Sequence, residues 1–151
     1  MKLKWEDSLS VDHGVIDHDH KLAIGMANKF IDMHKKFSSR KEAKKFLVTL
    51  RDNLIEHCDH EEQILKKICF DEFESHRLSH VDMIKNLDQI IERLYISKNI
   101  DLHDISITTM HFFKDFLVRH VLEDDMKIRD FIQMNITDND NSEKCSDVVY
   151  I

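Results

Sequence analysis

Residues 40–68, the stretch that decides the fold, read RKEAKKFLVTLRDNLIEHCDHEEQILKKI. Apolar side chains recur here at alternating spacings of three and four residues, which is the period of one buried helix face. That stripe comprises Ala43, Leu47, Leu50, Leu54, His57, Glu61, Ile64 and Ile68. An imidazole and a carboxylate thus occupy two core-facing positions. Because burying such groups without a partner is costly, the pattern predicts a shared partner inside the protein.

The other helical stretches repeat this arrangement. Residues 71–97 have a stripe of Phe73, His76, His80, Ile84 (or Met83), Leu87, Ile91 and Leu94. Near the C-terminus, Asp125 lies in the stripe Phe113, Leu117, Val121, Asp125, Ile128 and Ile132, and His120 is one position from it. His20 falls on the apolar face of the first helical stretch. At about 1.5 Å of rise per residue, the histidines and acidic residues of all four helical stretches lie at a similar depth in a bundle.

The predicted fold is an all-α, up-down-up-down antiparallel four-helix bundle with an irregular N-terminal arm. The chain contains no proline and only two glycines, which suits long helices with short joins. Helices are expected over about 17–37, 40–68, 72–96 and 101–133, and joins this short force neighbouring helices to be antiparallel. Residues 1–136 form one predicted domain, with the arm at 1–15. Residues 137–151 form a polar, flexible tail.

Charge and hydropathy exclude several classes of partner. The formal net charge is −7, whereas nucleic-acid binding needs clustered Lys and Arg. No apolar run is long enough to span a membrane. The N-terminus lacks the apolar run of a signal peptide, so the expected localisation is cytoplasmic.

Five imidazoles and two carboxylates exceed the needs of one four-coordinate zinc ion, which argues against a structural zinc bundle. They suit two first-row metal ions bridged by carboxylates, and the imidazole-rich set favours iron. A ferritin-type di-iron site would need Glu-x-x-His on two helices, and that motif is absent from the sequence. Nucleophile elbows and phosphate loops are absent as well, so we predict no catalytic residue.

In order along the chain, these motifs resemble the hemerythrin family, and within it the single-domain bacterial members. The similarity runs from Trp5 to about Ile132. Its elements are Trp5, Ile16-Asp17-x-x-His20 with Asn28, His57-x-x-x-Glu61-Glu62, His76-x-x-x-His80 and Phe116-Leu117-x-x-His120-Val121-x-x-x-Asp125.

The resemblance implies two non-haem iron ions joined by an oxo or hydroxo group. His76, His80 and His120 would hold one ion, and His20 and His57 the other, which keeps an open position for O2. Glu61 and Asp125 would bridge them. The choice of Asp125 rests on the family, since helix geometry alone slightly favours Asp124, four residues after His120.

Four positions that line the ligand pocket in the family have smaller residues here: Ala23, Cys58, Phe116 and Val121 stand where Leu, Phe, Trp and Ile are usual. The lost volume predicts faster autoxidation of the oxygenated form. The alternative is that neighbours such as Met26, Met110 or Phe112 refill the space. Glu62 is expected to be solvated and Cys58 to be a small apolar filler.

The predicted function is reversible, non-enzymatic O2 binding for storage, delivery or transport. One alternative is a sensor of O2, NO or redox state. Another is a di-iron redox enzyme, such as a peroxidase, a nitric oxide reductase or an iron-handling protein. The expected small-molecule partner is O2, with NO or peroxide under the alternatives.

Overall fold

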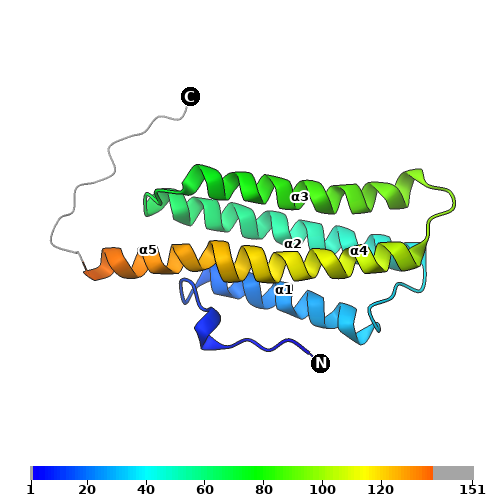
Figure 1. Ribbon diagram of the computed structural model, residues 1–151, viewed down its shortest axis with the longest axis horizontal. Coiled ribbons are helices and arrows are strands. Elements are labelled where there is room, and N and C mark those ends of the chain that lie inside the picture. Colours follow the sequence, from blue (N-terminus) through cyan, green and yellow to red (C-terminus); the bar gives the residue numbers. More distant parts are fainter. Residues whose placement is uncertain (1, 138–151) are drawn as a thin grey trace.

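The computed structural model describes residues 2–137, and every regular element in that range is helical. Four helical rods pack antiparallel (Figure 1), which confirms the predicted bundle. The fourth rod is built from three consecutive elements. In chain order the elements are η1 (Asp7–Leu9), α1 (Val15–Asp32), α2 (Arg40–Lys67), α3 (Phe73–Ile96), α4 (Leu102–Asp115), η2 (Phe116–Asp124) and α5 (Asp125–Thr137). Of the predicted tail, 137–151, only Thr137 is among the described residues.

Two helices begin at side-chain caps. The Ser39 hydroxyl accepts a hydrogen bond from the Glu42 amide at 3.1 Å, and Glu42 accepts one from the Ser38 amide at 2.6 Å. These contacts satisfy amides at the start of α2 that have no partner within the helix. Asp101 caps α4 in the same manner by accepting from the His103 amide at 2.9 Å.

Helix α1 is shorter than predicted: it ends at Asp32, not near Phe37. His34 and Lys35 adopt left-handed backbone conformations, with φ of 57° and 55°. The Lys35 amide then donates to the Phe30 carbonyl at 3.0 Å, which closes the last turn. Because neither residue is glycine or asparagine, the sequence contains no usual signal for this ending.

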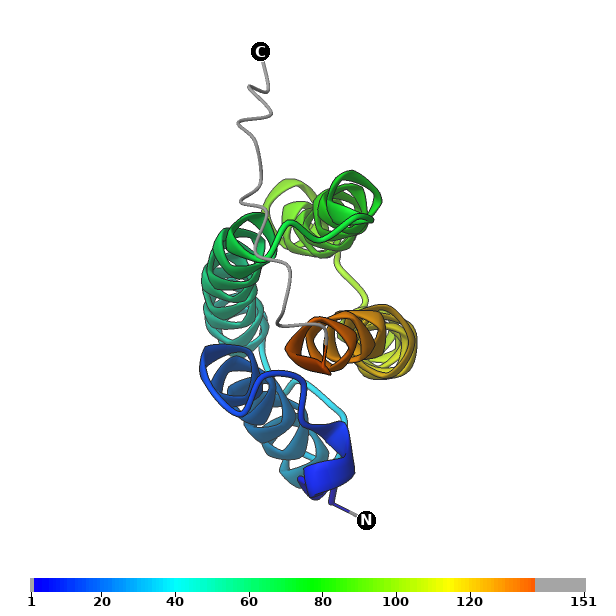
Figure 2. The same ribbon diagram turned by 90° about the vertical axis from the view of Figure 1, so that its left-hand side faces the viewer.

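Two apolar clusters fill the bundle, and the predicted polar positions lie between them. The smaller one consists of the buried residues Val11, Ile16, Leu65, Phe70, Phe73 and Ile128. The larger one extends from Ala23 and Cys58 to Phe30, Phe46 and Leu94. Seen end on, α1, α2 and α3 follow an arc, and the fourth rod lies on its inner side (Figure 2). Within residues 2–137, no helix combines the length and apolar character needed to cross a membrane.

The N-terminal arm is fixed to the bundle by specific contacts. The Asn28 side chain exchanges two hydrogen bonds with the Leu3 backbone, at 2.8 and 2.9 Å. Asp17 accepts from the Val11 amide at 2.7 Å. Arg129 of α5 donates to the Ser8 carbonyl at 3.0 Å. The arm therefore joins the first helix to the last one.

The fourth rod departs from the expected uninterrupted α-helix. Its middle, η2, is a π-helix, in which each amide donates to the carbonyl five residues earlier. The Asp125 amide, for example, donates to the His120 carbonyl. This segment winds more widely than an α-helix, so residues five apart lie above one another. That change decides which acidic residue faces the core.

Candidate metal centre

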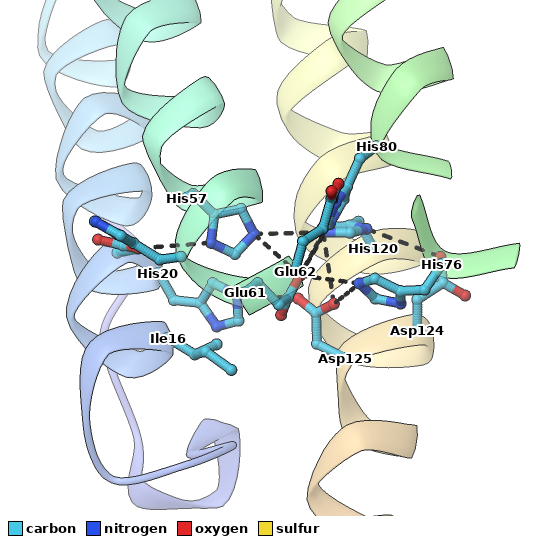
Figure 3. A network of polar contacts seen from close by, with 12 residues as sticks. Ile16, His20, His57, Glu61, Glu62, His76, His80, His120, Asp124 and Asp125 are labelled. Carbon is cyan, nitrogen blue, oxygen red and sulfur yellow. Dashed lines mark hydrogen bonds and ion pairs between the residues drawn. The ribbon is translucent and has the colours of Figure 1, made fainter. Parts of the chain in front are cut away.

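All seven predicted ligand residues lie in one buried layer, to which every rod of the bundle contributes (Figure 3). Helix α1 supplies one residue and α2 and α3 supply two each, while the fourth rod supplies one from η2 and one at the start of α5. No residue of the set is more than 5% exposed. The set is His20, His57, Glu61, His76, His80, His120 and Asp125.

Glu61 lies at the middle of this layer. Its Oε2 atom is 2.9 Å from Nε2 of both His76 and His80. The same oxygen is 3.7 Å from Nε2 of His57 and 3.9 Å from Nε2 of His120. One carboxylate thus faces imidazoles from three rods.

Asp125 spans the layer with its two oxygens. Oδ2 is 3.0 Å from His20 Nε2 on α1. Oδ1 points the other way, 3.4 Å from His76 Nε2 and 3.5 Å from His120 Nε2. The carboxylate therefore lies between one histidine of the predicted two-histidine side and two of the three-histidine side.

The π-helix explains why Asp125 lies in the layer and Asp124 does not. In an α-helix, residue i+4 lies closest to residue i, and i+5 points away from it. The i-to-i+5 hydrogen bonds of η2 bring Asp125 over His120 and move Asp124 aside. Asp124 is accordingly half-buried, with Oδ2 3.9 Å from the outer nitrogen, Nδ1, of His120. Sequence periodicity alone does not reveal the extra residue in this turn.

Several buried polar atoms of the layer have no hydrogen-bond partner, and metal ions could satisfy them. Glu61 Oε1, His57 Nδ1 and both nitrogens of His20 are fully buried without a hydrogen-bond partner, as are both oxygens of Asp125. Leaving such groups unsatisfied is costly, and a bound cation removes that cost. Three overlapping sets of four ligand atoms each lie within 4.8 Å, and Glu61 belongs to all three. Imidazole nitrogen and carboxylate oxygen are ligands for first-row metal ions, so these clusters can hold them.

The protonation equilibria of the layer are strongly perturbed. Burial lowers the pKa of His57 to about 3 and that of His120 well below its usual value. Burial opposes ionisation of Glu61, but the surrounding imidazoles outweigh it and hold its pKa well below the usual range. Burial and the nearby Glu61 raise the pKa of Asp125 to about 6. Neutral imidazoles and an ionised carboxylate are the forms that bind metal.

The four predicted pocket residues are all buried in the larger apolar cluster. Phe116 stacks on the His120 ring with centroids 5.6 Å apart and meets the His57 ring edge-on at 6.2 Å. Cys58 follows His57 and lines the same groove as His80. Ala23 and Val121 are buried in the same cluster.

Two carboxylates near the layer escaped the sequence prediction. Glu62, expected to be solvated, accepts a hydrogen bond from Nδ1 of His80 at 2.9 Å. Asp19 is nearly buried, accepts from His60 at 2.8 Å and lies 4.0 Å from His57 Nδ1. Neither residue falls on an apolar stripe, which is the pattern that predicts the other buried polar positions.

Sequence comparison gives distant relatives with a common name, although no family model matches the chain. Proteins named bacteriohemerythrin from Campylobacter jejuni subsp. jejuni, in strains 81-176 and 81116, are each 25% identical over 126 residues. The aligned region covers 82% of this chain and 90% of each relative. The protein from strain ATCC 700819 matches to the same extent. The chain is thus a distant homologue of the bacteriohemerythrins, and its buried layer of histidines and carboxylates is consistent with a hemerythrin-type metal site.

Proposed function

We propose that this protein binds O2 reversibly at a non-haem di-iron centre in the buried layer and serves in oxygen storage, delivery or transport. The observation that supports the proposal most is the position of the two carboxylates. Asp125 lies between the α1 and the α3–η2 histidines, and Glu61 is within 4 Å of imidazoles from three rods. Carboxylates between two imidazole groups are suited to bridging a pair of ions.

In this proposal each residue of the layer has a role. Three histidines, His76, His80 and His120, would hold one iron, and His20 and His57 would hold the other. Glu61 and Asp125 would be shared by the two ions. When bound and reduced, the iron pair would supply the electrons that O2 binding requires.

The surroundings of the layer favour binding over turnover. Apolar clusters lie on both sides of it, and Phe116 covers the rings of His57 and His120. Exclusion of water and protons slows the irreversible oxidation of a reduced centre.

The test is an optical spectrum of the iron-loaded, anaerobically reduced protein before air, in air, and after O2 has been removed under argon. We expect two irons per chain and a charge-transfer band that appears with air and disappears under argon. His20→Gln should lose this reversible band, because the two-histidine side loses a ligand. His18→Gln is the matched control, since His18 lies on the same helix and is exposed.

Each outcome decides between functions. A band that stays after O2 removal would contradict the carrier function and favour a redox role. Failure of the wild-type protein to retain iron would contradict the centre itself.

A sensor or redox enzyme is the second candidate, and one observation favours it. A surface groove of about 630 Å³ between α2 and α3 extends to Cys58 and His80. A solute such as peroxide or NO would come near the three-histidine side through this groove. Peroxide consumption by the reduced protein, measured with Cys58→Ala as the comparison, would separate this role from simple O2 binding.

A further inference from the structure

His80 is held at both ring nitrogens by consecutive residues of α2. Its Nε2 faces the layer, 2.9 Å from Glu61 Oε2. Its Nδ1 faces outward, 2.9 Å from Glu62 Oε1 (Figure 3). The ring is 2% exposed, so its orientation is set by these protein contacts and by the nearby Cys58.

The outer nitrogens of His20, His57 and His120 are held less closely. His57 Nδ1 is 4.0 Å from Asp19, whose carboxylate is already bonded to His60. His120 Nδ1 is 3.9 Å from Asp124. His20 Nδ1 has no hydrogen-bond partner. Within the described residues, carboxylates approach the outer ring nitrogens of His57, His80 and His120. Of these contacts, the one between Glu62 and His80 has hydrogen-bond length.

We infer that Glu62 is a positioning residue of the metal centre, a role that rests on the di-iron centre proposed above. A carboxylate on Nδ1 keeps the proton there and leaves the Nε2 lone pair directed into the layer. It also increases the basicity of the ring, which strengthens its bond to a metal ion. Glu62 thus acts on the three-histidine ion through His80 without touching the ion.

The groove between α2 and α3 supplies a matched control. Glu62 and Asp59 both line this groove from α2, and His80 lines it from α3. The Glu62 side chain is 22% exposed and reaches His80. Asp59 is exposed, and within residues 2–137 no hydrogen bond or ion pair involves it. Neutralising either residue therefore removes one negative charge from the same groove, but only one change alters the His80 contact.

The experiment is anaerobic titration of the metal-free full-length protein with Co²⁺, using the visible absorption of the bound ion. We expect Glu62→Ala to weaken one of the two binding steps by about 10- to 100-fold, the usual effect of removing such a partner. The visible bands of that ion should shift as well. Glu62→Gln should lose less affinity, because its amide oxygen can still accept from Nδ1. Asp59→Asn should change affinity by less than about twofold, as expected of an exposed charge.

Three results would overturn the inference. The first is equal affinity and equal spectra for Glu62→Ala and Asp59→Asn. The second is an equal loss at both binding steps together with a lowered melting temperature of the metal-free variant, which would make Glu62 a residue of the fold. The third is a wild-type protein that binds no Co²⁺. O2 plays no part in these titrations, so a protein that binds two ions but not O2 would contradict the proposed function and leave the role of Glu62 intact.

Discussion

Helix α2 and the π-helical part of the fourth rod contain the same short pattern but use it in opposite order. Each has a histidine, three further residues and then two acids: His57 precedes Glu61-Glu62, and His120 precedes Asp124-Asp125. In α2 the first acid enters the layer and the second contacts His80 from outside. In the fourth rod the second acid, Asp125, enters the layer and the first stays outside.

The backbone, not the residue types, makes this difference. In an α-helix, residue i+4 is rotated about 40° from residue i and residue i+5 about 140°. The wider π-helix brings i+5 back towards residue i. Sequence spacing therefore identifies an acidic pair near the site, and the local hydrogen-bond pattern selects the member that enters it.

Single-residue deletions in α2 and in η2 should give the largest difference in metal binding between the two helices. Deleting Asp59 should rotate Glu61 by about 100° out of the layer, together with the rest of α2. Deleting Glu123 should instead let η2 become α-helical, which puts Asp125 four residues after His120. We expect the first deletion to abolish metal binding and lower the melting temperature strongly. The second should retain both ions.

Metal content after desalting and thermal melting by circular dichroism would measure both effects. Equal behaviour of the two deletions would show that the π-helix is not what directs Asp125.

Neutralising the two aspartates separately is a smaller test of the same comparison. Asp125→Asn should weaken binding of at least one ion by about 100-fold or more, because a buried charged ligand is lost. Asp124→Asn should cost less than about fivefold, since its contact with His120 is longer than a hydrogen bond. Competition with a coloured chelator would give both constants. A larger effect at Asp124 would mean that the rod is α-helical in solution.

The stability of the metal-free protein should depend on pH through His57 of α2 and His120 of η2. His57 and His120 stay neutral in the fold to pH values well below 6.5, whereas the unfolded chain protonates them near 6.5. The unfolded state then binds more protons, so stability should fall as pH decreases from 6.5 towards 3. Each histidine contributes about 1.4 kcal/mol per pH unit. Asp125, with its pKa raised to about 6, takes up a proton in the fold first and offsets about one of them.

Urea unfolding of the metal-free protein at pH 7, 6 and 5 would measure this slope. His57→Gln and His120→Gln should each flatten it by a similar amount. A slope that neither substitution changes would place the acid sensitivity outside the layer.

The smallest expected effect concerns the pocket residues beside each histidine. Under the proposed function, Cys58→Phe next to His57 and Val121→Ile next to His120 should each slow the decay of the oxygenated form by a few-fold, because they fill space open to water. Ala23→Leu combined with Cys58→Phe should slow it further. The decay is followed optically in air. Rates equal to that of the wild type would favour the alternative in which neighbouring side chains already fill the space.

The stripes of α2 and α3 were predictable because both helices are regular and amphipathic. Beyond Glu61 the buried position in α2 is Leu65, not Ile64, and in α3, where the prediction left Ile84 or Met83 open, the buried one is Met83. Periodicity leaves such neighbours nearly equivalent, and packing decides between them. The end of α1 at Asp32 was not predictable, because it depends on left-handed conformations of two residues that rarely adopt them.

In the site, too, sequence periodicity predicts which positions are buried, whereas backbone geometry and helix packing decide the exceptions. Every residue of the predicted ligand set lies in the buried layer. The π-helix that selects Asp125 has no signal in the sequence, and family resemblance supplied that choice. The prediction for Glu62 was wrong because this residue lies beside the apolar stripe, where periodicity indicates exposure to solvent. In the structure, α3 packs close enough to bring His80 within hydrogen-bond distance of it.

The attachment of the arm has a consequence for the order of folding. Most helices of the bundle pack on a neighbour in the sequence, whereas the Arg129–Ser8 hydrogen bond joins residues 121 positions apart. Contacts of such long separation close the largest loop and form late. The junction of arm, α1 and α5 should therefore be the last part of the bundle to assemble and the first to open. Amide exchange at Val11, whose N–H is bonded to Asp17, would be faster than in the middle of α2.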